Sequence, residues 1–189
     1  MSEAFFSVVL PTKDRPALAA DVIRHTLRQS FRDFELVVVD NGSDDSTSIK
    51  ALQFGDPRVR IVRTGGLNMP DNWQAGLDAA RGKFVMMIED KLFLVEDALE
   101  RCSEILVESG SPLLSWMLGS CDGPGSANLG PVGPCTICSL PTSDFFHYGS
   151  HCMIDRYHKQ APRGMNMVLR KDFIVQIQAR IGRLCRPMA

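Results

Sequence analysis

One apolar run that ends abruptly in charged residues restricts this chain to a small set of architectures. Residues Phe84 to Ile88 are all apolar, and Glu89, Asp90 and Lys91 follow at once. Five residues suffice for a strand that is buried on both faces, whereas a helix needs a longer periodic stretch. The sequence therefore predicts a buried strand whose carboxyl end carries three charged side chains.

Similar apolar runs alternate with helical periodicity along the chain. The expected strands are residues 5–10, 34–39, 59–62 and 84–88, with shorter ones within 112–118 and 165–169. The expected helices are residues 16–29, a segment from about residue 46, 69–81, 95–108 and 170–183. This alternation favours right-handed βαβ crossovers. We therefore predict an α/β fold, with a Rossmann-like, doubly wound, mostly parallel sheet and helices on both faces.

Two of the expected helices have recognisable start signals. Asp14 is available to cap the first of them, and Pro16 suits its first turn. Asn68 is the expected cap of the helix over 69–81, with Pro70 in its first turn, and Gly82 is expected to end this helix.

The 189 residues suit a single domain made of two regions. Residues 1–118 hold the strand-helix alternation and form the expected core. Residues 119–189 form an expected irregular region of the same domain, ending in a helix. Five glycines and three prolines within 119–134 indicate a loop or flap there.

Charge and composition exclude several classes of partner and location. A formal net charge of -1, from charged residues of mixed sign, gives no basic surface for nucleic acid or an anionic membrane. No run approaches the roughly 20 apolar residues of a membrane span. The amino terminus carries Glu3 where a secretory signal would be basic, and the six cysteines follow no disulfide spacing. We therefore expect a cytoplasmic protein.

Polar side chains gather where three of the expected strands end. Thr12, Asp14 and Arg15 follow the first strand, Asp40 follows the second, and the charged triplet at 89–91 follows the fourth. Each of them alone suits a solvated loop or a helix cap. Because the carboxyl ends of parallel strands meet at one crevice, their coincidence predicts a ligand site.

Several spaced motifs resemble a known family. They are Ser-Val-Val-Leu-Pro-Thr-Lys-Asp-Arg from residue 7, Gln-Ser-Phe-Arg-Asp-Phe-Glu-Leu-Val-Val-Val-Asp-Asn-Gly-Ser-Asp-Asp-Ser-Thr from residue 29, Asn72-Trp73, and Gly-Leu-Asp-Ala-Ala-Arg-Gly from residue 76. Together with the strand before Glu89, they resemble the amino-terminal half of family 2 glycosyltransferases with the GT-A fold. The resemblance covers residues 5–110 or so.

The resemblance implies a nucleotide-sugar site. Thr12 and Asp14 match residues that line the nucleotide pocket, and Asp40 matches the carboxylate that accepts a hydrogen bond from the base, commonly uracil. Arg15 is a candidate near the phosphates, and Asn72 falls within a matching motif. The implied core is then a nucleotide-sugar-binding region at 1–118, with an acceptor side at 119–189.

The implied reaction is transfer of a sugar from a nucleotide-sugar donor to an unknown saccharide, lipid or protein acceptor. Inversion at the anomeric carbon is expected. The Gln-x-x-Arg-Trp signature of processive synthases is absent from the sequence, so we expect non-processive transfer.

The acids at 89 and 90 match the DXD-type motif of the family, which implies Mg²⁺ or Mn²⁺ bound by Asp90, with Glu89 as a possible substitute ligand. Lys91 stands where a second aspartate is usual. A protonated lysine cannot ligate a cation, although it can itself neutralise a diphosphate. Two alternatives follow: transfer with little or no metal, or a nucleotide-sugar-binding pseudoenzyme that lacks turnover.

The catalytic base is unassigned from sequence. The family places an acid beyond a helix like that over 170–183, and this chain ends at Ala189, so a truncated member is one expectation. Asp144 and Asp155 are the candidate bases, whereas Asp172 suits a helix start. A third reading takes the fold as a structural scaffold whose late Cys/His region binds a metal or a protein partner. Cys135, Cys138 and the nearby His147, His151 and Cys152 are then candidate zinc ligands, and otherwise ordinary loop residues.

Overall fold

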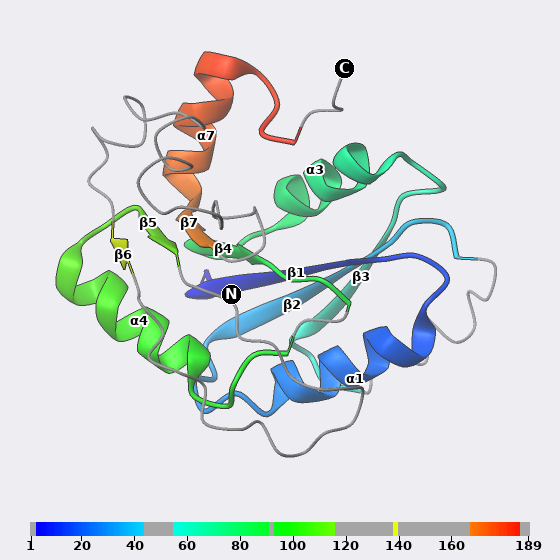
Figure 1. The fold of residues 1–189 in the computed structure, drawn as a ribbon, viewed down its shortest axis with the longest axis horizontal. Helices are drawn as coiled ribbons and strands as arrows, with labels where there is room; N and C mark the ends of the chain where they lie inside the picture. Colours follow the sequence, from blue (N-terminus) through cyan, green and yellow to red (C-terminus); the bar gives the residue numbers. More distant parts are fainter. Residues whose placement is uncertain (1–2, 44–54, 91–92, 116–137, 140–166, 186–189) are drawn as a thin grey trace, which may run out of the picture.

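The computed structural model describes residues 3–43, 55–90, 93–115, 138–139 and 167–185, and Figure 1 shows their arrangement. In chain order the elements are β1 (Phe6–Thr12), α1 (Pro16–Leu27), β2 (Phe34–Asp40), β3 (Val59–Arg63), α3 (Met69–Ala79), β4 (Phe84–Met87), α4 (Ala98–Ser109), β5 (Leu113–Ser115), β6 (Cys138–Ser139), β7 (Met167–Arg170) and α7 (Lys171–Ile181).

The strands form one sheet in the order β3-β2-β1-β4-β7-β5-β6. The first four of these are mutually parallel, whereas β7 runs antiparallel to β4 and to β5. The strand order reverses beside β1, which pairs with β2 on one side and with β4 on the other. The predicted α/β class, with a doubly wound and mostly parallel sheet, is confirmed.

Helices cover both faces of the sheet, as expected from strands that are apolar throughout (Figure 1). On one face, α1 and α4 pack against side chains such as Val8, Leu10 and Met86. On the opposite face, α3 and α7 pack against Val9 and Val37. Burying both faces of the central strands fixes them firmly, so their carboxyl ends offer a rigid frame for a site.

β1 is longer than the sequence indicates, because Pro11 does not end it. The pairing of β1 with β4 stops at Val9 and Met87, whereas its pairing with β2 continues to Thr12 and Asp40. By the alternation of a strand, Pro11 directs its nitrogen toward the β4 side, beyond the last paired residue. A proline there removes no ladder hydrogen bond.

The helix boundaries also differ slightly from expectation. The residue that caps α1 is Arg15, without a side-chain cap bond, and the expected cap Asp14 instead adopts a left-handed backbone with φ of 52°. For α3 the expected cap is confirmed, since Asn68 Oδ1 accepts a 2.9 Å hydrogen bond from the Asp71 amide. α3 ends at Ala79, before Gly82.

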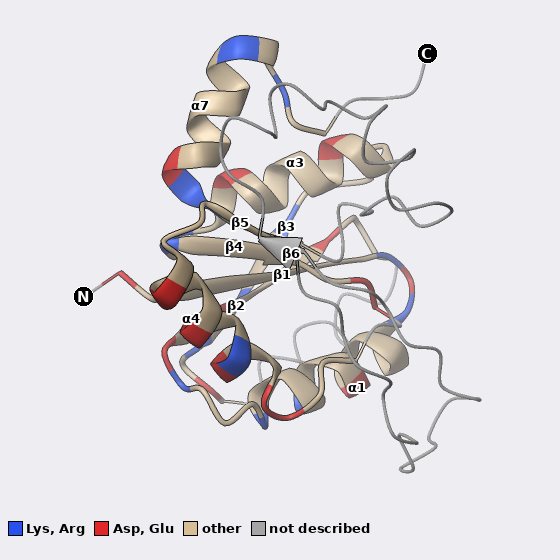
Figure 2. Cartoon of the chain, turned by 60° about the vertical axis from the view of Figure 1, so that its left-hand side comes forward, with Lys and Arg blue, Asp and Glu red and all other residues tan. Residues whose placement is uncertain are grey.

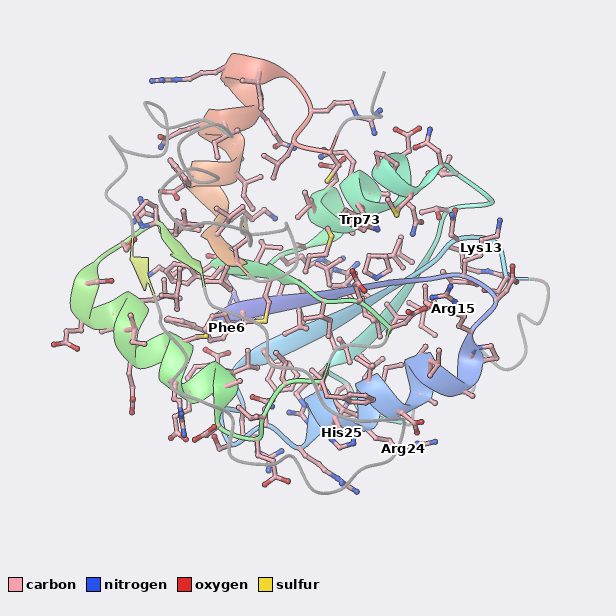
Figure 3. The ribbon with its side chains drawn as sticks, in the orientation of Figure 1. Phe6, Lys13, Arg15, Arg24, His25 and Trp73 are labelled. Atoms are coloured by element: carbon pink, nitrogen blue, oxygen red, sulfur yellow. The ribbon has the colours of Figure 1, made fainter. Side chains whose placement is uncertain are left out.

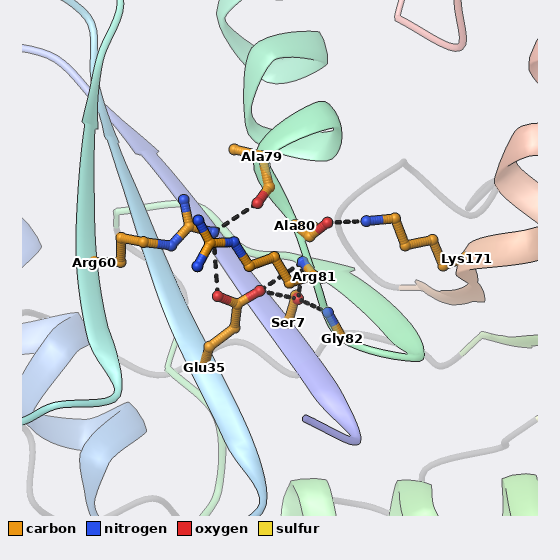
Figure 4. Close-up of polar contacts among 8 residues, drawn as sticks. All are labelled: Ser7, Glu35, Arg60, Ala79, Ala80, Arg81, Gly82 and Lys171. Carbon is orange, nitrogen blue, oxygen red and sulfur yellow. Dashed lines mark hydrogen bonds and ion pairs between the residues drawn. The ribbon is translucent and has the colours of Figure 1, made fainter. Parts of the chain in front are cut away.

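A partly buried polar cluster joins the strands at their amino ends, away from the predicted site (Figure 4). The Ser7 hydroxyl donates to Glu35 Oε1 at 2.6 Å and accepts from the Gly82 amide at 2.7 Å. Glu35 also accepts from the Arg81 amide at 2.6 Å and pairs with Arg60 at 3.1 Å. Burial alone would raise the pKa of Glu35, but these hydrogen bonds and the Arg60 charge together lower it.

Acidic and basic residues are interspersed over the described elements (Figure 2). Within the described residues, no helix combines the length and apolarity that a membrane crossing requires. The expected helix from residue 46 lies outside the described residues, and the division at residue 118 stays a prediction.

Candidate functional site

A cleft of about 710 Å³ opens at the carboxyl end of β1, where the strand order reverses. Its volume is in the range of about 300–1,000 Å³ typical of small-molecule sites. One wall comes from the turn between β1 and α1, and the other from the start of α3. Lys13 and Arg15 lie at that turn, and Trp73 lies on α3 (Figure 3). The lining residues are Pro11, Thr12, Lys13, Asp14, Arg15, Asn41, Leu67, Met69, Asn72, Trp73, Ile88, Glu89 and Asp90.

Asp90 lines the cleft and is only 7% exposed. Its Oδ1 lies 3.2 Å from Arg15 Nη1 in an ion pair, and its Oδ2 accepts a 3.4 Å hydrogen bond from the Thr12 hydroxyl. Three side chains from two strand ends thus meet, as the sequence predicts. The side chain of Arg15 remains 54% exposed.

Asp40 lies at the end of β2, directly before the lining residue Asn41; it is fully buried and does not itself line the cleft. Its Oδ1 accepts from the Ser43 amide at 3.0 Å. Its Oδ2 is 3.2 Å from Arg63 Nε, close enough for an ion pair but without the alignment of a hydrogen bond. Within the described ranges, Asp40 Oδ2 is therefore a buried acceptor with no hydrogen-bond donor. Such an atom is costly unless a ligand completes it.

Asn41 is a site residue that the sequence reasoning missed. Its side chain donates to the Leu67 carbonyl and accepts from the Leu67 amide, both at 2.7 Å. The Thr64 hydroxyl lies 2.5 Å from Asn72 Oδ1 and 3.2 Å from Asn41 Oδ1. These bonds fix the loop from β3 to α3 against the end of β2, and they place Asn72, 3% exposed, in the wall.

Two backbone features shape the rim. The Asp14 amide donates to the Ser43 hydroxyl at 2.9 Å, which ties the turn after β1 to the segment after β2. Gly42 has φ of 72°, and a Cβ there would lie 2.8 Å from the Gly66 nitrogen. Only glycine allows so close an approach of these two loops.

The side chains around Asp90 do not form the donor set of a divalent cation. Both oxygens of Asp90 already contact Arg15 or Thr12. In the described part of the chain, His, Cys, Asp and Glu side chains nowhere gather in threes around a point that could hold a metal ion. A hard cation needs several oxygen ligands, so the metal that the resemblance implies is not matched by these residues.

Most of the predicted site residues meet in this cleft. Thr12, Asp14, Arg15, Asn72, Glu89 and Asp90 all line it. Lys91 and the candidate bases Asp144 and Asp155 lie outside the described residues, as do the proposed zinc ligands except Cys138, of which only the backbone is described. The residues missed by sequence reasoning are Pro11, Lys13, Asn41, Leu67, Met69, Trp73 and Ile88. Pro11, Lys13, Asn41 and Trp73 lie within the motifs quoted above, and Ile88 ends the apolar run 84–88, so both signals were present in the sequence.

Solved structures identify the class of fold. TarS 1-349 from S. aureus, in complex with UDP-GlcNAc, superposes with a TM-score of 0.62 at 18% identity, over 92% of this chain and 47% of that one. The mannosyltransferase PcManGT from Pyrobaculum calidifontis, in complex with GDP-Man and Mn²⁺, gives 0.60 at 15% identity, over 97% and 48%. This protein therefore has the GT-A fold.

The sequence comparison then identifies the family. The sequence model of glycosyl transferase family 2 matches residues 7–118, and the chain belongs to that family. The GalNAc(5)-diNAcBac-PP-undecaprenol beta-1,3-glucosyltransferase of Campylobacter jejuni is 29% identical over 119 residues, which are 61% of this chain and 37% of the relative. The chain spans between about a third and a half of the curated relatives it matches first.

Proposed function

We propose that the cleft binds a nucleotide-sugar donor and that the protein transfers the sugar to an acceptor, with inversion and without processivity. The observation that carries the proposal is Asp40 Oδ2, a buried carboxylate oxygen that is ion-paired with Arg63 but accepts no hydrogen bond from the described residues; Asp40 directly precedes Asn41, which lines the cleft. An imide or amino NH of a nucleotide base is a donor that would satisfy it. Uracil is one such base.

The residues in and next to the cleft differ in the ligand groups they suit. Asn72 in the lining, and Asp40 next to the lining residue Asn41, supply acceptors and amide groups suited to a base and ribose, and Thr12 and Asp14 line the cleft. Arg15 supplies a charged fork that matches phosphate oxygens. Asp90 pairs with Arg15, so we assign it to the sugar-phosphate side of the donor, and Lys91 follows it in the sequence. Trp73 and Met69 offer apolar surface opposite these polar groups.

The proposed reaction is a single displacement. An acceptor hydroxyl oxygen attacks the anomeric carbon, the bond from that carbon to the diphosphate oxygen breaks, and the electron pair leaves with the nucleoside diphosphate. Negative charge then grows on the leaving phosphate, and a nearby cation such as Arg15 stabilises it. The hydroxyl proton passes to a carboxylate base, for which Asp144 and Asp155 stay the candidates from sequence.

Calorimetric titration of the chain with UDP and GDP tests donor binding, and Asp40→Asn is the variant of choice because it keeps the size of the side chain. We expect saturable binding, weakened about 10- to 100-fold by Asp40→Asn, because a hydrogen bond to a charged acceptor contributes roughly 1.5–3 kcal/mol. Asp21→Asn, on the exposed side of α1, is the matched control and should bind as the wild type does. Equal affinities for both variants would contradict the role of Asp40.

The second candidate is a nucleotide-sugar-binding module without turnover, favoured by Lys91 at a position usually held by an acid. Release of nucleoside diphosphate from UDP-sugars and GDP-sugars separates the two. The first acceptor to try is a saccharide on undecaprenyl diphosphate, the acceptor type in the name of the Campylobacter jejuni relative. Tight donor binding with neither transfer nor donor hydrolysis would favour the binding module.

A further inference from the structure

We propose that Arg15 takes the place of a divalent cation at the donor diphosphate, and that Asp90 positions Arg15 instead of ligating a metal. This inference rests on the proposed function, since it concerns how the same cleft handles the diphosphate. It would make nucleotide binding independent of added Mg²⁺ or Mn²⁺.

The first support is the direction in which the pair faces. Asp90 is 7% exposed and has both carboxylate oxygens engaged, one by Arg15 at 3.2 Å and the other by Thr12 at 3.4 Å. The Arg15 side chain is 54% exposed at the cleft rim. The cleft therefore borders the exposed guanidinium group of Arg15, whereas the Asp90 carboxylate is largely buried.

The second support is the chemistry of the guanidinium group. The group carries five N–H donors in a planar fork, and Nη1 is the nitrogen that bonds to Asp90. The remaining donors match phosphate oxygens, which Arg can bind in pairs. Arg15 is also the N-cap residue of the 12-residue α1, whose positive end favours an anion at the same place. Because Asp90 already orders the side chain, less conformational entropy is lost when a diphosphate binds.

The third support is the charge at the cleft. Two basic residues that line it, Lys13 and Arg15, stand against three acids, Asp14, Glu89 and Asp90. A fourth acid in the cleft would disfavour a diphosphate further unless a divalent cation offset its charge. In the sequence, a lysine and not an acid follows Asp90.

The test is calorimetric titration with UDP and GDP, once in EDTA and once in excess Mn²⁺. We expect the wild type to bind in EDTA, with less than about a threefold gain from Mn²⁺. Arg15→Ala should lower the affinity in EDTA about 10- to 100-fold, as removal of a charged hydrogen-bonding group does. The affinity of Arg15→Lys should lie between those of the wild type and Arg15→Ala, because lysine keeps the positive charge but lacks the planar guanidinium group. Arg24→Ala, which removes an exposed arginine from the other end of α1, is the matched control and should leave the affinity unchanged (Figure 3).

A double-mutant cycle tests the positioning role of Asp90. If Asp90 acts through Arg15, Asp90→Asn should weaken binding in EDTA, and the double variant with Arg15→Ala should be no weaker than Arg15→Ala alone. Fully additive losses would contradict that role.

Direct titration of the wild type with Mn²⁺, followed by the electron paramagnetic resonance of the free ion, should show no tight site without nucleotide. Lys91→Asp should restore a Mn²⁺ response, and an unchanged response would overturn the charge argument.

Failure of this inference is distinguishable from failure of the proposed function. Binding that occurs only with Mn²⁺, and that persists in Arg15→Ala, would overturn the role of Arg15 and leave the nucleotide site intact. Absence of binding under both conditions would instead sink the proposed function itself.

Discussion

Gly82 shows how a single residue can be identified correctly from sequence for the wrong reason. The sequence assigns it to the end of the helix over 69–81, but α3 ends at Ala79. A Cβ on Gly82 would lie 2.7 Å from the backbone of Phe6 and Ser7, so the position needs glycine because the chain passes against β1 there. Gly82 and its neighbours Phe6 and Ser7 are about 75 positions apart in the sequence, so a local sequence pattern cannot predict this close approach.

Glu35 gives a residue-scale prediction about pH. Its pKa is lowered in the folded protein, so its stabilising effect is complete above the ordinary pKa of 4.5 and is lost as the pH falls through the lower folded value. Glu35→Gln should lower the free energy of unfolding by about 1–3 kcal/mol at pH 7, because the hydrogen bonds from Ser7, Arg81 and Arg60 lose their charged acceptor. Urea denaturation of the wild type and of Glu35→Gln, at pH 7 and at pH 3, measures this difference in the free energy of unfolding.

The difference between wild type and Glu35→Gln should shrink at pH 3. Glu104→Gln, an exposed acid on α4, is the control and should change the stability little at either pH. A Glu35→Gln deficit that stays constant down to pH 3 would contradict the linkage between this carboxylate and folding.

At the scale of elements, the strands were predictable and their partners across the chain were not. Apolar runs such as 34–39 and 84–88 mark strands because both faces of the sheet are covered by helices. The convergence of polar side chains at the strand ends follows from the same geometry. The ion pair of Arg15 with Asp90 spans 75 positions, and the clamp of Asn41 on Leu67 spans 26. Such pairs arise from tertiary packing, which one sequence does not specify locally.

Residues 183–185, which follow α7, contact α3. Gln74 Oε1 accepts from the amides of Leu184 and Cys185 at 3.1 and 3.2 Å, and Arg183 pairs with Asp71 at 2.6 Å. Burial raises the pKa of the Cys185 thiol to about 11, and the nearby Arg183 charge offsets part of that rise. The segment therefore packs against the helix whose first turn borders the cleft.

Gln74→Ala should release this segment and expose Cys185. Because the thiolate is the reactive form, a thiol that loses its burial should be alkylated faster at pH 8. Peptide-resolved mass spectrometry after brief N-ethylmaleimide treatment should show at least a several-fold increase at Cys185, with buried Cys102 unchanged. Gln176→Ala, an exposed change on α7, is the control. Equal labelling of Cys185 in wild type and Gln74→Ala would show that Gln74 does not hold the segment.

At the scale of the whole molecule, the sheet divides the protein into two ends with different tasks. At the amino ends of the strands, Ser7 and Glu35 bond to each other and to the Arg81 and Gly82 amides, and Glu35 also pairs with Arg60 (Figure 4). The carboxyl ends carry a cleft, and near it, among the described residues, the buried Asp40 Oδ2 accepts no hydrogen bond and is held only by the ion pair with Arg63. Stability is thus supplied at one end, and binding capacity is kept at the other.

The most direct test of the central claim is amide hydrogen exchange of this chain alone and with saturating UDP, GDP, ADP, CDP or dTDP. For at least one nucleotide, slowed exchange should appear in residues 12–15, 41–43, 64–73 and 88–90. Exchange at the amino-end cluster, including Arg81 and Gly82, should stay unchanged. Nucleotide-independent exchange at the cleft, or protection confined to the opposite end of the sheet, would contradict the assignment of this cleft as a donor site.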